Sequence, residues 1–331
     1  MKKARRFMSA VLTVLFLFPA ISASAASSGK EVVIGGMPFG LTMYTSGVIV
    51  ISVDDNGSPA KEAGVRENDI ITKANGEEIS TNEELKEIIE KSAGADIELS
   101  LTRGKSPISL RITPEQNGDG EYTVGMWIRD SAAGLGTVTY FDEGSYSFGA
   151  LGHGICDRDT GILLPLRSGK MMEAKVTSTT KAQKGVAGGL NGYMTDSTIG
   201  EITVNNGFGI FGRYAAPPAG ERVKCADMDE IEPGKAQIYC TVDKEGVKPY
   251  DIEIEKLNLD DNTGQNMVIR VTDSDLLDKT GGIVQGMSGS PIVQNGKLVG
   301  AVTHVFVNSP QTGYGIAIGN MLDSYRKYGG Y

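Results

Sequence analysis

Short runs in which β-branched and aromatic residues alternate with polar or small ones recur along most of the chain after residue 30. Residues 48–53, 69–74, 97–103 and 108–112 have this pattern, and turn-forming residues separate them. Runs of this kind predict β-strands. Between the second and third run, apolar residues at 85, 88 and 89 have helical spacing, and Ser80 with Glu83, or Thr81 with Glu84, forms a capping box ahead of them. A helix is therefore expected there.

Beyond residue 122 the same short alternating runs continue to about residue 317, separated by irregular turns. Only the last part, residues 320–328, has a helical pattern, with Asn320 as its cap. About two hundred residues of short strands with one terminal helix predict a mainly β fold, either a closed double β-barrel or a sandwich.

Composition supports a strand-rich chain and argues against nucleic acid as a partner. Glycine accounts for 44 of 331 residues, about twice its usual share of ~7%, and the glycines show no period. The formal net charge is −9, whereas nucleic-acid binding needs clustered Lys and Arg. No nucleic acid is expected as a partner.

The first 25 residues predict export across a cytoplasmic membrane. Four cations precede an apolar run that extends to about Ile21, and Ala23-Ser24-Ala25 supplies a small-x-small cleavage pattern. We therefore interpret residues 1–25 as a signal peptide, with a retained membrane anchor as the alternative.

Three cysteines, Cys156, Cys225 and Cys240, are too few and too unevenly spaced for a disulfide framework. Cys225 and Cys240 have the separation of a hairpin bridge, but we expect all three to be structural.

Residues 31–114 resemble a bacterial PDZ domain. The resemblance rests on "GSPAKEAGVRENDIITKANGEEI", in which a small-residue helix, a Gly-x-x-x-x-Asp step and an Asn-Gly turn follow in order. Such domains add a peptide C-terminus, or an internal segment, as a strand. The resemblance implies that Phe39, Gly40 and Leu41 form the loop that holds the peptide carboxylate. Residues 115–122 then form a linker, and residues 123–331 a second domain.

Two glycine-flanked residues in this second domain suggest nucleophilic catalysis. Ser288 lies in "QGMSGSPIV", and His153 lies in "FGALGHGICDRDTG". A serine hydroxyl needs an imidazole base and backbone N–H groups for the oxyanion, and Gly286 allows the turn that aims the N–H groups of Gly286 and Ser288 at one point. Taken alone, a Gly-x-Ser-Gly segment is also common in ordinary turns. The order of histidine before serine favours the double barrel of chymotrypsin-like peptidases.

Several segments together resemble the stage IV sporulation protein B (SpoIVB) serine peptidases. They are "FGALGHGICDRDTG", "GIFGRY", and the long block from Asn266 that ends in "TGYGI", together with the PDZ-like unit ahead of them. The resemblance implies a PDZ-like domain followed by a chymotrypsin-like double β-barrel. It also implies an enzyme exported to the space between forespore and mother cell. There it would process itself and cleave a membrane-bound inhibitor of an intramembrane metalloprotease, which activates a late mother-cell sigma factor.

The same resemblance assigns His153 as base, Ser288 as nucleophile and Asp273 as acid. The residues alone do not select Asp273, because four other aspartates could also orient the imidazole: Asp157, Asp159, Asp196 and Asp275. Asp196 is separated from His153 by a distance along the chain closer to that in ordinary chymotrypsin-like enzymes.

His304, in "AVTHVFV", is the second of only two histidines. By alternation it shares a strand face with Val302 and Phe306, where a hydrogen-bonded core histidine is common. The alternative is that it lines the substrate pocket, since it follows the nucleophile by one strand.

Two other function classes remain open from sequence. An HtrA-like envelope quality-control protease also carries a PDZ unit, but after the catalytic domain, and a PDZ-containing adaptor would need no activity. The segment "GFGIFG" matches G-x-G-x-x-G without a βαβ context, and no HExxH or other metal-ligand cluster occurs. We therefore expect no cofactor and no catalytic metal.

Overall fold

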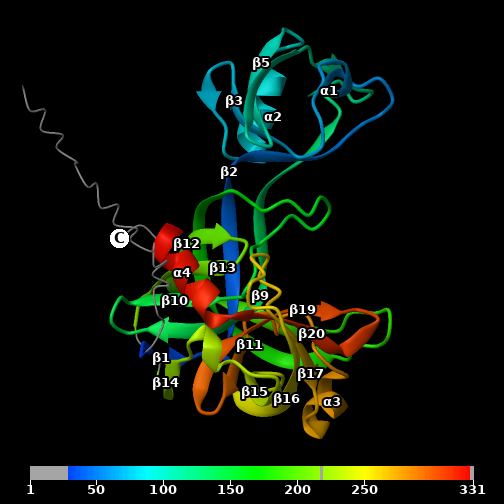
Figure 1. Cartoon of the computed structure of the whole chain (residues 1–331). Coiled ribbons are helices and arrows are strands. Elements are labelled where there is room, and N and C mark those ends of the chain that lie inside the picture. Colours follow the sequence, from blue (N-terminus) through cyan, green and yellow to red (C-terminus); the bar gives the residue numbers. More distant parts are fainter. Residues whose placement is uncertain (1–28, 217–218, 329–331) are drawn as a thin grey trace, which may run out of the picture.

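The structure is a computed structural model that describes residues 29–216 and 219–328. The expected signal peptide or anchor, residues 1–25, lies outside the described residues. Figure 1 shows a smaller unit connected by two long strands to a larger, strand-rich body. These strands are β2 (Pro38–Val53) and β9 (Met126–Asp142).

The first barrel closes through six antiparallel strands. Going round it, β2 pairs with β9, then come β10, β13 and β12, and β11 pairs again with β2. The remaining bounds are β10 (Ser147–Ala150), β11 (Leu166–Thr180), β12 (Gly189–Asn206) and β13 (Gly209–Tyr214). Side chains such as Phe39, Leu41 and Met43 alternate inward along β2 and are buried in this core.

A second barrel closes in the same way, in the order β15, β16, β17, β20, β19, β18 and back to β15. The bounds are β15 (Gly234–Cys240), β16 (Lys248–Leu257), β17 (Met267–Val271), β18 (Pro291–Gln294), β19 (Lys297–Phe306) and β20 (Ser309–Ala317). The double-barrel prediction is confirmed.

Short elements join the two barrels. β1 (Glu31–Ile34) pairs with β9 and with β14 (Arg222–Cys225), and β14 pairs in parallel with β19. The terminal helix α4 (Ile318–Tyr328) packs its apolar face into the core beside β1. A 3₁₀ turn (Met228–Glu230) and helix α3 (Ser274–Thr280) complete this body.

The PDZ-like unit has a hydrophobic core of its own. It contains α1 (Pro59–Glu62), β3 (Asp69–Ala74), β4 (Glu77–Glu78), α2 (Asn82–Lys91), β5 (Ile97–Arg103) and β6 (Ser106–Ile112). Thr81 and Glu84 form the capping box of α2, and Leu85 and Ile89 are buried beneath it. The expected helix is therefore present, with the second of the two capping pairs.

The PDZ-like unit is inserted into the first barrel rather than placed ahead of it. β1 and the first half of β2 pair with barrel strands, although the sequence suggested a PDZ boundary at residue 31. The expected linker contains a small hairpin, β7 (Glu115–Gln116) and β8 (Tyr122–Thr123). Residues 126–129 of β9 then pair with residues 49–53 of β2 and add a strand to the PDZ-like sheet.

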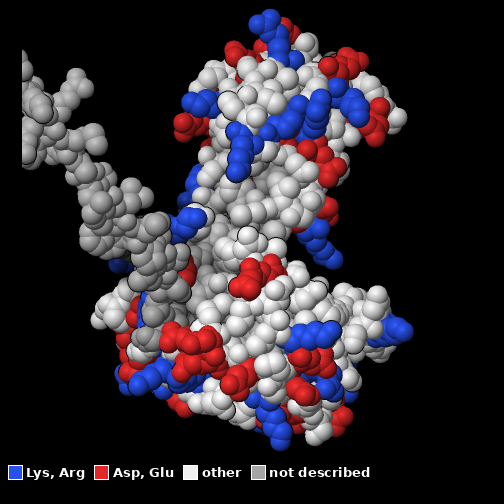
Figure 2. Space-filling view, in the orientation of Figure 1, with Lys and Arg blue, Asp and Glu red and all other residues white. Residues whose placement is uncertain are grey.

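The charged surface, the cysteines and the helices bear on the remaining expectations from sequence. Acidic and basic side chains are interspersed over both units on the face drawn in Figure 2. All three cysteines are free, Cys225 and Cys240 being buried and Cys156 exposed. Among the residues that the structure describes, no helix is both long and apolar enough to cross a membrane.

Candidate active site

Ser288 lies in a tight turn that only glycines allow. Gly286 and Gly289 have φ of +97° and +95°, a region that residues with a Cβ rarely occupy. The N–H of Met287 donates to the carbonyl oxygen of Val284 (3.1 Å), and that of Ser290 to the carbonyl oxygen of Met287 (2.9 Å). Within residues 29–216 and 219–328, the N–H groups of Gly286 and Ser288 have no protein acceptor. The turn thus leaves unpaired the two donors expected for an oxyanion.

His153 follows a turn at the end of β10. Leu151 and Gly152 both have left-handed backbone conformations, with φ of +67° and +69°. The ring Nδ1 lies 2.9 Å from the carbonyl oxygen of Gly154. Because a carbonyl only accepts, Nδ1 carries the proton and Nε2 is left as the basic nitrogen. Burial lowers the pKa of His153 from its usual value, which favours the neutral form that a general base requires.

The ring of His304 lies against that of His153, with ring centroids 4.6 Å apart and planes inclined by 36°. The alternation expected along β19 fails here because the pairing with β20 shifts register between Val302 and Val305. Val302 is buried, whereas His304 is turned outward over the site. Desolvation of its ring, with a smaller contribution from His153, lowers the pKa of His304 to about 4. Both imidazoles are therefore neutral at pH 7.

The hydroxyl of Ser288 donates to the carbonyl oxygen of Thr303 (2.6 Å). Thr303 precedes His304, whose ring contacts His153. Ser288 is therefore connected to His153 through Thr303 and His304, at the bulge of β19. The Thr303 hydroxyl is buried and has no partner among the described residues. Sequence reasoning missed Thr303 and the Gly154 carbonyl because both contacts use main-chain oxygens.

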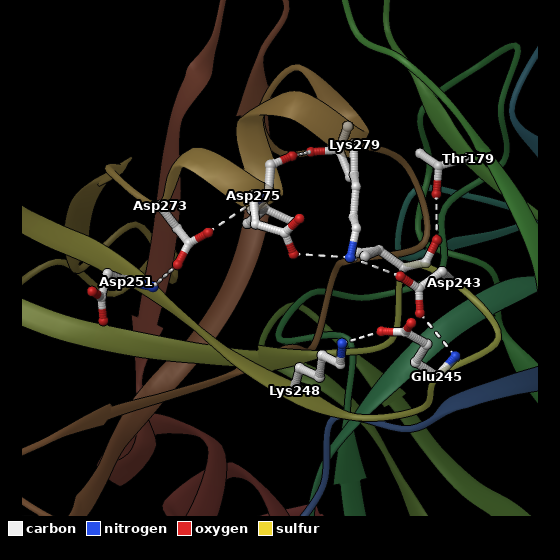
Figure 3. Close-up of polar contacts among 11 residues, drawn as sticks. Thr179, Asp243, Glu245, Lys248, Asp251, Asp273, Asp275 and Lys279 are labelled. Atoms are coloured by element: carbon white, nitrogen blue, oxygen red, sulfur yellow. Dashed lines mark hydrogen bonds and ion pairs between the residues drawn. The ribbon is translucent and has the colours of Figure 1, made fainter.

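The structure does not bring Asp273 to His153. Asp273 is the N-cap of α3, where Oδ1 accepts from the N–H of Leu276 (3.0 Å) and Oδ2 from the N–H of Asp251 (3.2 Å). Figure 3 shows these two contacts at the start of the helix. The physical reason is local, because an aspartate before a helical run satisfies the otherwise unpaired N–H groups of the first turn.

Ion pairs also fix the last turn of α3. Lys279 forms ion pairs with Asp275 (2.8 Å) and Asp243 (2.9 Å), and these contacts raise the pKa of Lys279. Figure 3 shows its ammonium between the two carboxylates. Helix α3 leads directly into the segment that carries Ser288, so these contacts position that segment.

The other aspartates considered from sequence have different surroundings. Asp157 and Asp159 pair with Arg129, and Asp275 pairs with Lys279. Asp196 is exposed on β12. In the described part of the chain, no carboxylate forms a hydrogen bond with His153.

Residues 120–322 match the family model described as SpoIVB peptidase S55, and residues 35–113 match a PDZ domain model. The first match covers more than half of the chain. The chain belongs to the SpoIVB peptidase S55 family. It is a serine peptidase of the SpoIVB type with a PDZ domain.

Among curated proteins, this SpoIVB peptidase is similar to serine protease HTRA1 of Xenopus tropicalis, with 32% identity over 72 residues. That match covers 22% of this chain and 15% of the relative, so the chain spans only a small part of HTRA1.

Two solved structures also resemble parts of the chain. The PDZ domain of an SdrC-like protein from Listeria monocytogenes has 22% identity and a TM-score of 0.23, covering 25% of this chain and 87% of that one. The active form of the Rv3671c protease from M. tuberculosis has 16% identity and a TM-score of 0.32, covering 50% and 76%.

The PDZ loop predicted for this SpoIVB peptidase lies elsewhere. Phe39, Gly40 and Leu41 form part of β2 inside the first barrel, where β9 and β11 pair with them on both sides. Phe39 and Leu41 are buried, at 0% and 4% exposure. Such a segment has no free edge for a peptide carboxylate, so this prediction is wrong.

A groove of about 650 Å³ lies instead between α2 and residues 121–128. Lys86 and Ile89 line it from the helix, and Trp127, 76% exposed, lines it from β9. At its edge, Val124-Gly125-Met126 has an apolar-Gly-apolar pattern, and Gly125 has φ of +69°. That pattern was the available signal, but the linker expected from sequence ended at residue 122, which assigned this segment to the second domain.

Proposed function

We propose that this chain is an exported serine endopeptidase of sporulation in which Ser288 is the nucleophile and His153 the base. The observation that carries the proposal is the nucleophile turn, in which the N–H groups of Gly286 and Ser288 have no protein acceptor in the described chain. Family membership supports the reaction class, and the neutral His153 supports the role of base.

In the proposed reaction, the Ser288 hydroxyl turns from the Thr303 carbonyl oxygen towards Nε2 of His153. His153 takes the hydroxyl proton as Oγ attacks the peptide carbonyl carbon, and the oxyanion is held by the N–H groups of Gly286 and Ser288. Collapse breaks the C–N bond, and the imidazolium returns the proton to the leaving amine. Water then attacks the acyl-ester by the same proton path. The Gly154 carbonyl oxygen keeps Nδ1 protonated throughout.

The proposed substrates are the chain itself and a membrane-bound inhibitor of an intramembrane metalloprotease. Cleavage of that inhibitor would release the metalloprotease to activate a late mother-cell sigma factor. The site of action would be the space between forespore and mother cell, reached by export or from a membrane anchor. Membership of the SpoIVB family supports this assignment.

The PDZ domain is proposed to take a peptide C-terminus or an internal segment in the groove beside α2. The edge of residues 126–129 that does not pair with β2 would add the peptide as a strand, and Lys86 would attract its carboxylate.

The test compares the wild-type chain with Ser288→Ala, both lacking residues 1–25. We expect self-cleavage and labelling by a fluorophosphonate in the wild type and neither in Ser288→Ala. Equal labelling of both proteins would place the nucleophile elsewhere, and an intact, unlabelled wild type would contradict the enzymatic proposal.

A further inference from the structure

Thr137 of β9 contacts the nucleophile turn through two of its groups. Its hydroxyl donates to the carbonyl oxygen of Gly286 (2.7 Å), and its N–H donates to the carbonyl oxygen of Ser288 (3.0 Å). Thr137 is 1% exposed. The strand belongs to the first barrel and the turn leads into the second, so these bonds cross between the barrels.

The same residue contacts the loop that carries the base. The N–H of Leu151, two residues before His153, donates to the carbonyl oxygen of Thr137 (3.3 Å). Further along β9, the hydroxyl of Thr139 donates to the carbonyl oxygen of Gly289 (2.8 Å), and Thr139 is fully buried. One strand therefore holds the nucleophile turn and the histidine loop together.

These bonds restrain the peptide groups on both sides of the oxyanion donor at Ser288. The Gly286–Met287 peptide is held at both ends, by the Thr137 hydroxyl and by the carbonyl oxygen of Val284. The Ser288–Gly289 peptide is held by the Thr137 N–H and by the carbonyl oxygen of Val302. Between them lies the Met287–Ser288 peptide, whose carbonyl oxygen accepts from the N–H and the hydroxyl of Ser290. The direction of its N–H is set by these contacts together with the two restrained neighbours.

We infer that Thr137 is a positioning residue for the oxyanion donors, an inference that rests on the proposed role of Ser288 as nucleophile. Its hydroxyl fixes the turn by a hydrogen bond that the backbone of β9 does not supply. Without it, the Gly286–Met287 peptide would be restrained at its N–H end only. Since misplacement of reacting groups by about 1 Å can cost about 100-fold in rate, loss of this single hydroxyl should affect turnover.

The test uses the chain without residues 1–25 and a fluorogenic peptide that spans its self-cleavage site, which mass spectrometry of the cleaved wild-type chain identifies first. Thr137→Val keeps the side-chain shape and removes the hydroxyl, Thr137→Ala removes it without crowding, and Thr137→Ser restores it. Thr241→Val is the matched control, because Thr241 is also buried and its hydroxyl donates to a carbonyl oxygen, that of Gly36 (3.2 Å), away from the nucleophile turn.

For Thr137→Val and Thr137→Ala we expect kcat and the fluorophosphonate labelling rate to fall by about 10- to 100-fold, with KM changed less than about 3-fold. Thr137→Ser should recover most of the rate, and Thr241→Val should lower only the melting temperature. An unchanged kcat in the folded variants would overturn the inference. The inference would also be overturned if Thr137→Val and Thr137→Ala both failed to fold while Thr241→Val folded, because the Thr137 hydroxyl would then be needed for folding. Ser288→Ala in the same assay separates the two proposals, since residual activity there would contradict the nucleophile itself.

Discussion

The imidazole ring of His304 lies against that of His153, with their ring centroids 4.6 Å apart and their planes inclined by 36°. The only hydrogen-bond partner of His153 in the described chain is the Gly154 carbonyl oxygen. The base is thus oriented by a main-chain group and covered by a second imidazole. Desolvation lowers the pKa of both rings although His304 is partly exposed to solvent. Because the His304 ring covers part of the His153 ring, it affects the protonation of the base.

His304→Ala should move the acid limb of the kcat/KM profile to higher pH. The base acts when neutral, so activity falls as the pH drops through the pKa of His153. Removing the covering ring exposes His153 to water and returns its pKa towards 6.5. His304→Phe keeps the cover and should keep the limb near its wild-type position. The measurement is the kcat/KM profile of wild type, His304→Ala and His304→Phe with one peptide between pH 4 and 8. An acid limb at the same pH in all three proteins would contradict the idea that cover by His304 lowers the pKa of His153.

His304→Ala should also change cleavage-site preference more than turnover. The ring is exposed over the site on the strand after the nucleophile, where it would contact substrate residues beside the cut. Mass-spectrometric profiling of a peptide library by wild type, His304→Ala and His304→Phe measures this. Unchanged preference in both variants would reject a role for His304 in the substrate pocket.

Leu41→Ala should destabilise the catalytic body by about 2–5 kcal/mol, the usual cost of truncating a buried leucine. Leu41 is 4% exposed within the core of the first barrel. If residues 39–41 formed a PDZ loop, the same change would weaken peptide binding instead. Chemical denaturation, together with a peptide-binding assay on the folded fraction, separates the two outcomes.

Sequence reasoning predicted the strands from their period-two alternation, which left a double barrel or a sandwich open, and the order of His153 before Ser288 favoured the barrel. It recovered α2 because its cap and apolar stripe are local. It missed the insertion of the PDZ domain because β2 runs unbroken for 16 residues through both units. No local pattern shows that one strand belongs to two sheets. The catalytic role given to Asp273 stays a prediction. In the structure its carboxylate accepts from the N–H groups of Leu276 and Asp251, and a motif position alone does not show which N–H groups compete for a carboxylate.

Trp127 offers a direct probe of the PDZ groove. It is the only tryptophan in the chain, it is 76% exposed, and it lines the groove beside α2. Peptides with free, apolar C-termini should therefore shift its emission on binding, and Lys86→Ala should weaken the response if the ammonium attracts the carboxylate.

The control for this titration is the same peptide set with amidated C-termini. A response to free acids alone indicates C-terminal recognition, and an equal response to both forms indicates an internal segment. Trp127→Phe should abolish the signal without abolishing binding by calorimetry. A flat titration with every peptide, confirmed by calorimetry, would contradict the groove as a peptide site.

Asp273→Asn distinguishes a helix cap from a catalytic acid. In a serine–histidine–aspartate triad, exchanging the acid for its amide lowers kcat by about 10⁴-fold. As an N-cap, asparagine is about as good as aspartate, and its carbonyl oxygen can still accept from the N–H of Leu276, as Oδ1 of Asp273 does. We therefore expect Asp273→Asn to retain activity within about 10-fold of wild type, the remaining loss reflecting the acceptor withdrawn from the N–H of Asp251.

Asp273→Ala completes this comparison, because it removes the cap and the contact with Asp251 together. Loss of an N-cap costs about 0.5–2 kcal/mol, so its melting temperature should fall below that of Asp273→Asn, and its activity should fall in parallel as the segment before Ser288 loosens. The measurements are kcat, labelling rate and thermal unfolding of the three proteins. If Asp273→Asn were inactive while unfolding like the wild type, the carboxylate itself would act in catalysis, and α3 would have to rearrange to bring it to His153.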